Sequence, residues 1–388
     1  MFYNYLNFET YLPYKTSPIK SGYFLLLSSL LDKNSDLLMC CRLCETLVTH
    51  GANTELSDQI QEKIIKGKEV ELACHPTGNF IIQRLLDTIS DKEVFVSLVE
   101  TVSVSVETIL GSGCTGVILA LVKAAVRLSS GQTVILNKII DALHCQDSQD
   151  SVSSCLVFMV TKENMSQDNL SVHLHGSVIL QQLLLFSKPI KLVRSLLSLP
   201  AAKLSMILSD PRGCHITDSF MTSSTVGEKS RESLVKSLKG EFVSLATSKH
   251  GTRTLDSLWK HSSVKSKQVM VEELSSRVDV LNSNKFGFFV VKKWFIQEFK
   301  RNKSDWLSLI DKENKIVNSF SEIIGDKVSL GKRKNDSNAN NSTTEAATPA
   351  KKKEVADLVD DWLKPESASD KKEKKEKKKK AKSYLDDL

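Results

Sequence analysis

Asn79, Phe80 and Gln83 form a triplet whose side chains could recognise a nucleotide base. If they lie on a helix, the two carboxamides are four residues apart and therefore project from the same face. A carboxamide can both donate to and accept from a base edge, and an aromatic ring beside it can stack on a base. The triplet therefore predicts recognition of an unpaired nucleotide and not a reaction centre.

The triplet belongs to a motif that recurs along the chain: a short turn, a glycine and then a helical pattern. Numbering each glycine as position zero, the recognition triplet occupies positions +1, +2 and +5. The glycines are Gly78, Gly116, Gly176, Gly213, Gly251 and Gly287, at intervals of 38, 60, 37, 38 and 36 residues. We interpret the 60-residue interval as one repeat with an insertion, placed around residues 145–154, where the sequence becomes polar.

Apolar residues define the helices that must position these triplets. Positions +3, +4, +7 and +8 share one side of a helix and are mostly apolar, as in Ile81, Ile82, Leu85 and Leu86. Further apolar-periodic segments precede the glycines, at residues 60–72, 95–110, 200–208, 234–246 and 269–281. Two or more helices in about 37 residues cannot bury a core alone, so the units must stack on one another. The pattern predicts an all-α solenoid.

The other units carry different side chains on the face that we expect to point outward. Their +1, +2 and +5 residues are Val117, Ile118, Leu121; Ser177, Val178, Gln181; Cys214, His215, Asp218; Thr252, Arg253, Asp256; and Phe288, Phe289, Lys292. The second unit is wholly apolar, and we expect it to recognise no base. Arg253 could stack on a base or pair with a phosphate, and Lys292 and Lys293 suit phosphate.

Composition limits the class of protein but does not by itself indicate a nucleic-acid partner. Of the 388 residues, 41% are hydrophobic, which excludes a wholly disordered chain. Residues 331–388 hold 16 Lys and Arg against 12 Asp and Glu, a net charge of +4. Subtracting these from the totals of 53 and 46 leaves 37 and 34, or +3, for residues 1–330. Nucleic-acid binding must therefore depend on where the charges lie.

The motif and its spacing resemble the Pumilio (PUF-type) repeat family. Gly78 followed by Asn-Phe-x-x-Gln is similar to that family's base-recognition triplet. Residues 210–220, 248–259 and 284–294 are similar to a nucleolar branch of the family that acts in ribosome biogenesis. The resemblance covers residues 37–320. It implies a curved α-solenoid that binds single-stranded or partly structured pre-ribosomal RNA on its concave face.

The resemblance also implies a nuclear and nucleolar protein that supports small-subunit (18S) rRNA maturation by occupying RNA without cleaving it. Its partners would be RNA and proteins of the pre-ribosomal particle, and we expect a monomer with no membrane association. We take as candidate RNA-binding residues Asn79, Phe80, Gln83, Ser177, Gln181, Cys214, His215, Arg253, Phe289, Lys292 and Lys293. Only the first unit keeps the full triplet, which argues against a strict code of one base per repeat.

The chain divides into three parts by its sequence pattern. Residues 36–325 are the predicted solenoid. Residues 1–35 do not look like a Pumilio repeat, and we interpret them as an atypical N-terminal segment of a truncated or alternative form. Residues 326–388 are predicted to be a disordered Lys-rich tail, which suits nucleolar localisation, a nonspecific RNA arm or simple solubility. Residues 355–363 within it have helical apolar spacing and could bind a partner.

Two alternative functions remain open at this point. The near-neutral body and the apolar second triplet favour a protein-binding scaffold of the armadillo or HEAT kind. A ribonuclease would need a carboxylate or histidine cluster, and we find none, so we expect no enzyme activity, no catalytic residue and no cofactor.

Cys41 and Cys44 form one CxxC pair, a weak zinc signal beside the simpler interpretation of buried thiols. We explain His75, His173, His175 and His250 by local hydrogen bonding in the turns before the helices or by contact with the preceding repeat.

Overall fold

The computed structural model describes residues 48–49, 61–167 and 170–315, and these residues contain helices and connecting turns with no strand. They belong to two compact units, residues 1–291 and residues 292–388, each of which is considered by itself below. The predicted N-terminal segment 1–35, the Cys41–Cys44 pair and the predicted tail 326–388 lie outside the described residues.

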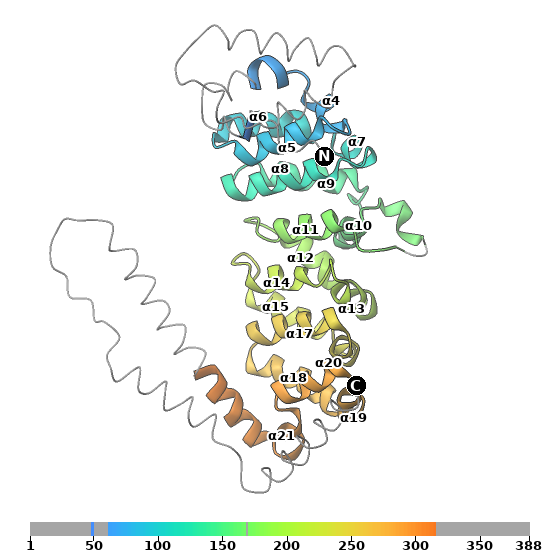
Figure 1. The fold of residues 1–388 in the computed structure, drawn as a ribbon, viewed down its shortest axis with the longest axis vertical. Coiled ribbons are helices and arrows are strands. Elements are labelled where there is room, and N and C mark those ends of the chain that lie inside the picture. The colour runs from blue at the N-terminus through green and yellow to red at the C-terminus, as the bar shows by residue number, and fades with distance from the viewer. Residues whose placement is uncertain (1–47, 50–60, 168–169, 316–388) are drawn as a thin grey trace, which may run out of the picture. The chain divides into compact units, whose positions relative to one another are not determined.

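Residues 69–275 of the first unit form five successive repeats of three helices, and a sixth repeat begins at Val278, which confirms the predicted all-α solenoid. The helices are α4 (Glu69–Cys74), α5 (Asn79–Thr88), α6 (Lys92–Ser103); α7 (Val106–Gly111), α8 (Thr115–Leu128), α9 (Gln132–Ala142); α10 (Val152–Phe158), α11 (Leu174–Leu183), α12 (Ile190–Leu197); α13 (Ala201–Ser209), α14 (His215–Thr222), α15 (Glu228–Ser237); α16 (Phe242–Thr247), α17 (Lys249–His261), α18 (Val264–Ser275); and α19 (Val278–Ser283), α20 (Lys285–Lys293), α21 (Ile296–Arg301). In Figure 1 the helices of the first unit follow one another in chain order, from blue to orange.

The helices that carry the predicted triplets are the middle helices of the repeats: α5, α8, α11, α14, α17 and α20. Within the first unit, α5 packs on α8, α8 on α11, α11 on α14, and α14 on α17. Their apolar positions form the core, because residues such as Ile81, Leu180, Phe220 and Leu258 have no solvent exposure. One row of adjacent helices therefore presents the triplets on neighbouring surfaces (Figure 1).

Most middle helices are capped at their N-terminal end. The capping side chain belongs to the residue three positions before position zero, and it accepts a hydrogen bond from the backbone N–H at position zero. His75 Nδ1 accepts from the N–H of Gly78 at 3.0 Å, and His173 Nδ1 accepts from that of Gly176 at 3.3 Å. Ser248 Oγ and Asn284 Oδ1 accept from the position-zero N–H in the same way, at 2.9 and 3.1 Å. These bonds satisfy donors that have no partner inside the helix. They confirm that local bonding explains His75 and His173.

Position zero is glycine in the repeats where the middle helix crosses the first helix very closely. A Cβ atom on Gly213 would overlap the carbonyl oxygen of Ile207, at the end of α13. A Cβ atom on Gly176 would likewise overlap the carbonyl oxygen of Leu156 on α10. Backbone atoms cannot move aside as the end of a side chain can, so a larger residue is excluded at these crossings.

The insertion in the third repeat lies in two places, and the larger part is not where we predicted it. Residues 143–151 separate α9 from α10 and include the 3₁₀ turn Gln149–Ser151. Residues 159–173 separate α10 from α11 and include the 3₁₀ turn Lys162–Ser166. The prediction of residues 145–154 found the first part only. Its polar composition made it visible, whereas Val152–Phe158 just after it is buried helix.

The second unit is described over residues 292–315. It contains α21 and a further helical stretch over residues 303–315. Trp294 and Trp306 have no solvent exposure, and the indole N–H of Trp306 donates to the carbonyl of Trp294 at 3.0 Å. Phe299 lies edge-on to Trp306, with ring centroids 5.2 Å apart. Aromatic packing therefore organises this segment.

Within residues 61–167 and 170–315, no single helix is both long and apolar enough to cross a bilayer. Helices α12 and α13 together have a suitable length and composition, with a bend of 108° between them. Several of their apolar residues are buried in the protein core, among them Leu192, Leu196, Leu204 and Ile207, whereas Ile190 and Met206 are exposed.

Candidate nucleic-acid interface

The second repeat has a different register from the one that its glycine suggests. Val117, Ile118 and Leu121, which we predicted to be its outward triplet, have no solvent exposure and lie in the core. The buried pair Val117 and Ile118 matches Ile81 and Ile82 of the first repeat, which puts Cys114 at position zero. The prediction for this repeat is therefore wrong by two residues, because the sequence Gly113-Cys-Thr-Gly116 offers two glycines and neither marks the crossing.

The corrected register gives the second repeat a partly polar triplet of Thr115, Gly116 and Leu119. The three atoms nearest to a Cβ on Gly116 would all belong to the Gln83 side chain, whereas each glycine at position zero has a backbone carbonyl oxygen among its three nearest atoms. Thr115 Oγ1 lies 2.7 Å from Nδ1 of His175, which belongs to the third repeat. Sequence reasoning missed Thr115, and the run of apolar pairs Val117-Ile118 and Leu121-Val122 is the signal that could have found it.

The first triplet combines a buried, fixed amide with two more accessible side chains. Asn79 is buried, and its Nδ2 donates to the carbonyls of His75 and Pro76, both at 2.8 Å. Its Oδ1 accepts from Nε2 of Gln83 at 2.7 Å. The Phe80 ring, by contrast, is 45% exposed. The backbone thus orients Asn79, Asn79 orients Gln83, and Phe80 is available for stacking.

The third repeat repeats this arrangement with a hydroxyl in place of the first amide. Ser177 is buried, and its Oγ donates to the carbonyl of Arg212 in the next repeat at 2.6 Å. Gln181 Nε2 donates to Ser177 Oγ at 3.1 Å. In both repeats the +1 residue is thus a buried anchor for the +5 amide. The predicted outward face is therefore narrower in these two repeats than the pattern indicated, because their +1 side chains are buried.

The fourth and fifth repeats are joined by an ion pair on this surface. Cys214, at +1, is buried, and burial raises the pKa of its thiol. Arg253 at +2 of the fifth repeat donates to Asp218 at +5 of the fourth, with an N–O distance of 2.9 Å. His215 lies on the same carboxylate, 3.7 Å away. Arg253 is therefore placed on the predicted surface, but its guanidinium already has an acidic partner.

The sixth repeat presents aromatic rings in place of amides. Phe289 is 62% exposed and lies edge-on to Phe288, with ring centroids 5.9 Å apart. Such rings suit stacking against bases. Lys292 and Lys293, which belong to the second unit, are exposed at the end of α20. Their predicted phosphate contacts remain predictions, as do the RNA contacts of the other candidate residues.

Two histidines near the third repeat are held in the neutral form. Burial is the main reason that the pKa of His173 lies below its ordinary value, and the positive charge of Arg212 adds to this effect. Burial also lowers the pKa of His175, with a smaller effect from Lys123. The two rings lie edge-on, 5.9 Å apart. In the neutral form, each ring can donate one hydrogen bond and accept another.

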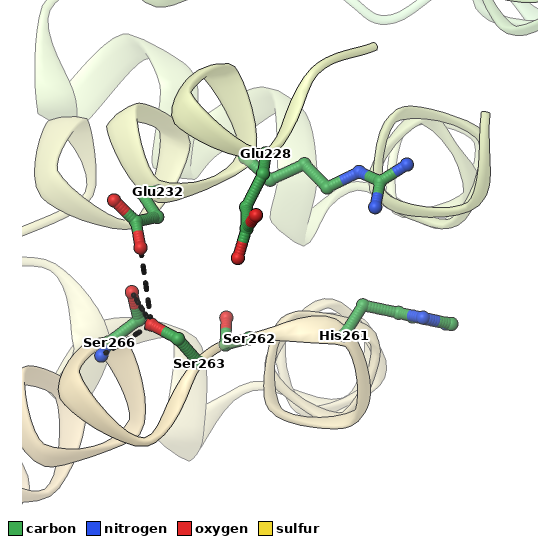
Figure 2. A pocket seen from close by; sticks show the side chains of 7 residues that line it. Glu228, Glu232, His261, Ser262, Ser263 and Ser266 are labelled. Carbon is green, nitrogen blue, oxygen red and sulfur yellow. Dashed lines mark hydrogen bonds between the residues drawn. The ribbon is translucent and has the colours of Figure 1, made fainter. Parts of the chain in front are cut away.

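The pocket in Figure 2 lies away from these candidate residues. It is lined by Glu228, Arg231, Glu232, His261, Ser262, Ser263 and Ser266, from α15, the end of α17 and the start of α18. Ser263 Oγ donates to Glu232 Oε1 at 3.3 Å (Figure 2). Two carboxylates make this pocket a poor phosphate site. Among the described residues, no group of three or more His, Cys, Asp and Glu side chains is placed to hold a metal ion.

Stacked three-helix repeats with outward triplets on adjacent middle helices define the chain as a Pumilio-type repeat protein. The chain belongs to the family described as the NOP9-like PUF repeat domain, whose model matches residues 27–289. It is 30% identical to mouse nucleolar protein 9 (Mus musculus) over 66% of this chain and 44% of that protein. Against the human protein (Homo sapiens), the identity is 29% over 67% and 45%. The chain thus spans less than half the length of these relatives.

Solved structures show the same fold. The structure titled APUM23-GGAUUUGACGG superposes with a TM-score of 0.65 at 21% identity, covering 74% of this chain and 55% of that one. PUF-8 in complex with PBE-RNA gives a TM-score of 0.51 at 15% identity, with 72% of each chain covered. At these identities the similarity establishes the solenoid fold. It does not establish which residues bind RNA.

Proposed function

We propose that this protein binds pre-ribosomal RNA in the nucleolus, through the surface formed by its middle helices. The observation that carries the proposal is the first triplet, in which a fixed amide pair lies beside an exposed ring. Nucleolar protein 9, the name of the mouse and human relatives, supports the nucleolar location. The titles of two structural neighbours name RNA beside the protein, which supports RNA as the partner.

The triplets suit single-stranded RNA better than a duplex. A ring such as Phe80 can stack only on a base that is not already stacked, and an amide reaches a base edge best when that edge is unpaired. The buried +1 residues limit the number of bases that each repeat can distinguish. We therefore expect sequence preference at a few positions, with phosphate contacts supplying much of the remaining affinity.

Binding alone would account for a role in maturation of small-subunit (18S) rRNA. A protein that covers single-stranded precursor RNA shields it from nucleases and controls when that RNA can form base pairs. We expect no cleavage by the protein itself, and proteins of the pre-ribosomal particle are the expected further partners. An assay for RNA cleavage in Mg²⁺ tests this, since any cleavage that purifies with the wild-type chain would contradict it.

The test of RNA binding uses the full chain and labelled GGAAUUGACGG, one of the RNAs named with APUM23. A permuted RNA of the same composition is the control. We expect tighter binding to the first RNA, or to another sequence found by selection, and weakening as salt increases. No binding to any single-stranded RNA would favour the protein-binding scaffold, which the apolar outward residues Leu119 and Val178 would suit.

A second experiment tests which RNA is bound in cells. Crosslinking of the full chain to RNA, with the bound positions mapped, should enrich precursors of small-subunit ribosomal RNA. Imaging of the same tagged chain should place it in the nucleolus. Enrichment on the 3′ ends of messenger RNA would contradict the ribosomal assignment while leaving RNA binding intact.

A further inference from the structure

Gly116 leaves room for a side chain of the first repeat to lie against the second repeat. It occupies the +2 position in the corrected register, where the first repeat has the Phe80 ring. The side-chain amide of Gln83 lies against it: a Cβ on Gly116 would be 2.7 Å from Gln83 Nε2 and 2.9 Å from Oε1. The glycine therefore brings a polar group of the first repeat to the surface of the second.

The second repeat has no polar residue at +5. In the first and third repeats the +5 amide donates to the +1 residue, as Gln83 does to Asn79 and Gln181 to Ser177. Leu119 occupies +5 in the second repeat and cannot make this bond. By that comparison, Thr115 at +1 would lack its usual partner within the repeat.

His175 takes the place of the missing amide. It is the second residue of α11 and lies one position before Gly176, and its Nδ1 is 2.7 Å from Thr115 Oγ1. His175 is half-buried, so part of its ring reaches the surface. With Nδ1 committed to Thr115, the other ring nitrogen, Nε2, can donate or accept one further hydrogen bond.

We infer that His175, oriented by Thr115, is a base-recognition residue that serves the second repeat from the third. This inference rests on the proposed function, because it names a specificity-determining residue of the same RNA-binding surface. His175 contacts Thr115, and Gln83 lies against Gly116, the next residue of α8. The expected ligand of His175 is the edge of one unpaired base, held by one imidazole hydrogen bond.

A single imidazole hydrogen bond discriminates less than an amide that makes two. Net hydrogen bonds of this kind correspond to changes of roughly 2- to 10-fold in binding. The effect should appear at one nucleotide position only, because His175 touches one repeat surface. A merely structural role would weaken all RNAs together, so base preference is the readout that separates the two roles.

The experiment compares full-chain variants on a panel of RNAs in which each position of GGAAUUGACGG is replaced in turn. His175→Ala should reduce the preference at one position by roughly 2- to 10-fold and leave the other positions as in the wild type. His250→Ala is the matched control, since His250 also lies one position before a glycine at the second residue of a middle helix. It should leave the preference at the His175 position unchanged.

Thr115→Val provides a second variant in case His175→Ala does not fold. Valine keeps the shape of the buried threonine and removes only the hydroxyl that orients the imidazole, so it should reduce the preference at the same position. Wild-type preference in both variants, or equal weakening for every RNA, would overturn the inference while RNA binding stands. If the wild-type chain binds no RNA, the proposed function and this inference both fail.

Discussion

Helices α5 and α8 pack in the same way and differ on their outer faces. The buried pairs Ile81-Ile82 and Val117-Ile118 occupy equivalent places, 36 residues apart. Around them, α5 has an amide pair and an exposed ring, whereas α8 has a hydroxyl, a glycine and a leucine. Packing register and base recognition are therefore set by different residues. A repeat can lose its own recognition triplet without losing its place in the solenoid.

The two helices also differ in what their glycines do. In the first repeat Gly78 lies at the crossing with α4, close to Leu72. In the second repeat the crossing residue is Cys114, and Gly116 faces the Gln83 side chain. The same residue type thus serves close backbone approach in one repeat and surface space in the next.

The largest effect is expected when a crossing glycine is replaced. Gly213→Ala should destabilise the protein by about 3 kcal/mol, because its Cβ would overlap the Ile207 carbonyl and force the helices apart. Gly116→Ala should change stability by less than about 1 kcal/mol, since only the flexible end of Gln83 must move. Urea unfolding of both variants measures this. Equal destabilisation would show that Gly116 also lies at a close crossing.

The next largest effect concerns RNA affinity and the first triplet. Asn79→Ala with Gln83→Ala should weaken binding to the best RNA by about 1–3 kcal/mol, from lost hydrogen bonds to one base. The family resemblance makes uracil the expected base there. Asn137→Ala with Gln146→Ala removes two exposed amides outside the middle helices and is the matched control. Unchanged affinity of the first double variant in titration binding would show that the triplet has no recognition role.

Much of the fold could be predicted from the sequence because the apolar core residues recur with the period of the structural repeat. Glycine intervals of 36–38 residues and apolar residues at +3, +4, +7 and +8 were enough to predict stacked helical repeats. The number of helices per repeat was less evident. Segments such as residues 95–110 look like one apolar run but break between α6 and α7, at Val104 and Ser105.

The candidate surface was harder to predict because neighbouring repeats complete it. The sequence placed Asn79, Ser177 and Cys214 on the outward face, but each is buried. The Ser177 hydroxyl bonds Arg212 in the next repeat, and Thr115 bonds His175, 60 residues away. No spacing rule within one repeat contains such partners. The Arg253–Asp218 ion pair could not be predicted either, because it also joins two successive repeats.

A smaller and less specific effect is expected from the basic residues. Replacing Arg253, Lys292 and Lys293 by alanine should weaken all RNAs about equally and flatten the dependence of affinity on salt. Asp218→Asn provides the opposite change, because it removes the carboxylate that now holds Arg253. It should raise affinity by up to about fivefold, the size of a surface ion pair. A triple variant with the wild-type salt dependence would show that these charges do not contact RNA.

The smallest effect concerns pH and compares the histidine cap of α11 with the asparagine cap of α20. His173 caps its helix as a neutral acceptor, and its lowered pKa means that the unfolded chain takes up the proton more readily. Stability from this group is therefore present above about pH 6.5 and is lost as the pH falls through the folded-state pKa. His173→Asn should keep the cap, as Asn284 does in the sixth repeat, without titrating.

Thermal unfolding at pH 7.5 and 5.5 compares this variant with the wild type. The two should have similar stability at pH 7.5, and the variant should lose less stability at pH 5.5, by no more than about 1 kcal/mol. His175, which faces His173, still titrates, so the variant should still lose some stability at pH 5.5. His173→Ala should be less stable than the wild type at both pH values, because it lacks the cap. The same pH dependence in the wild type and in His173→Asn would contradict the role of this histidine as a titrating cap.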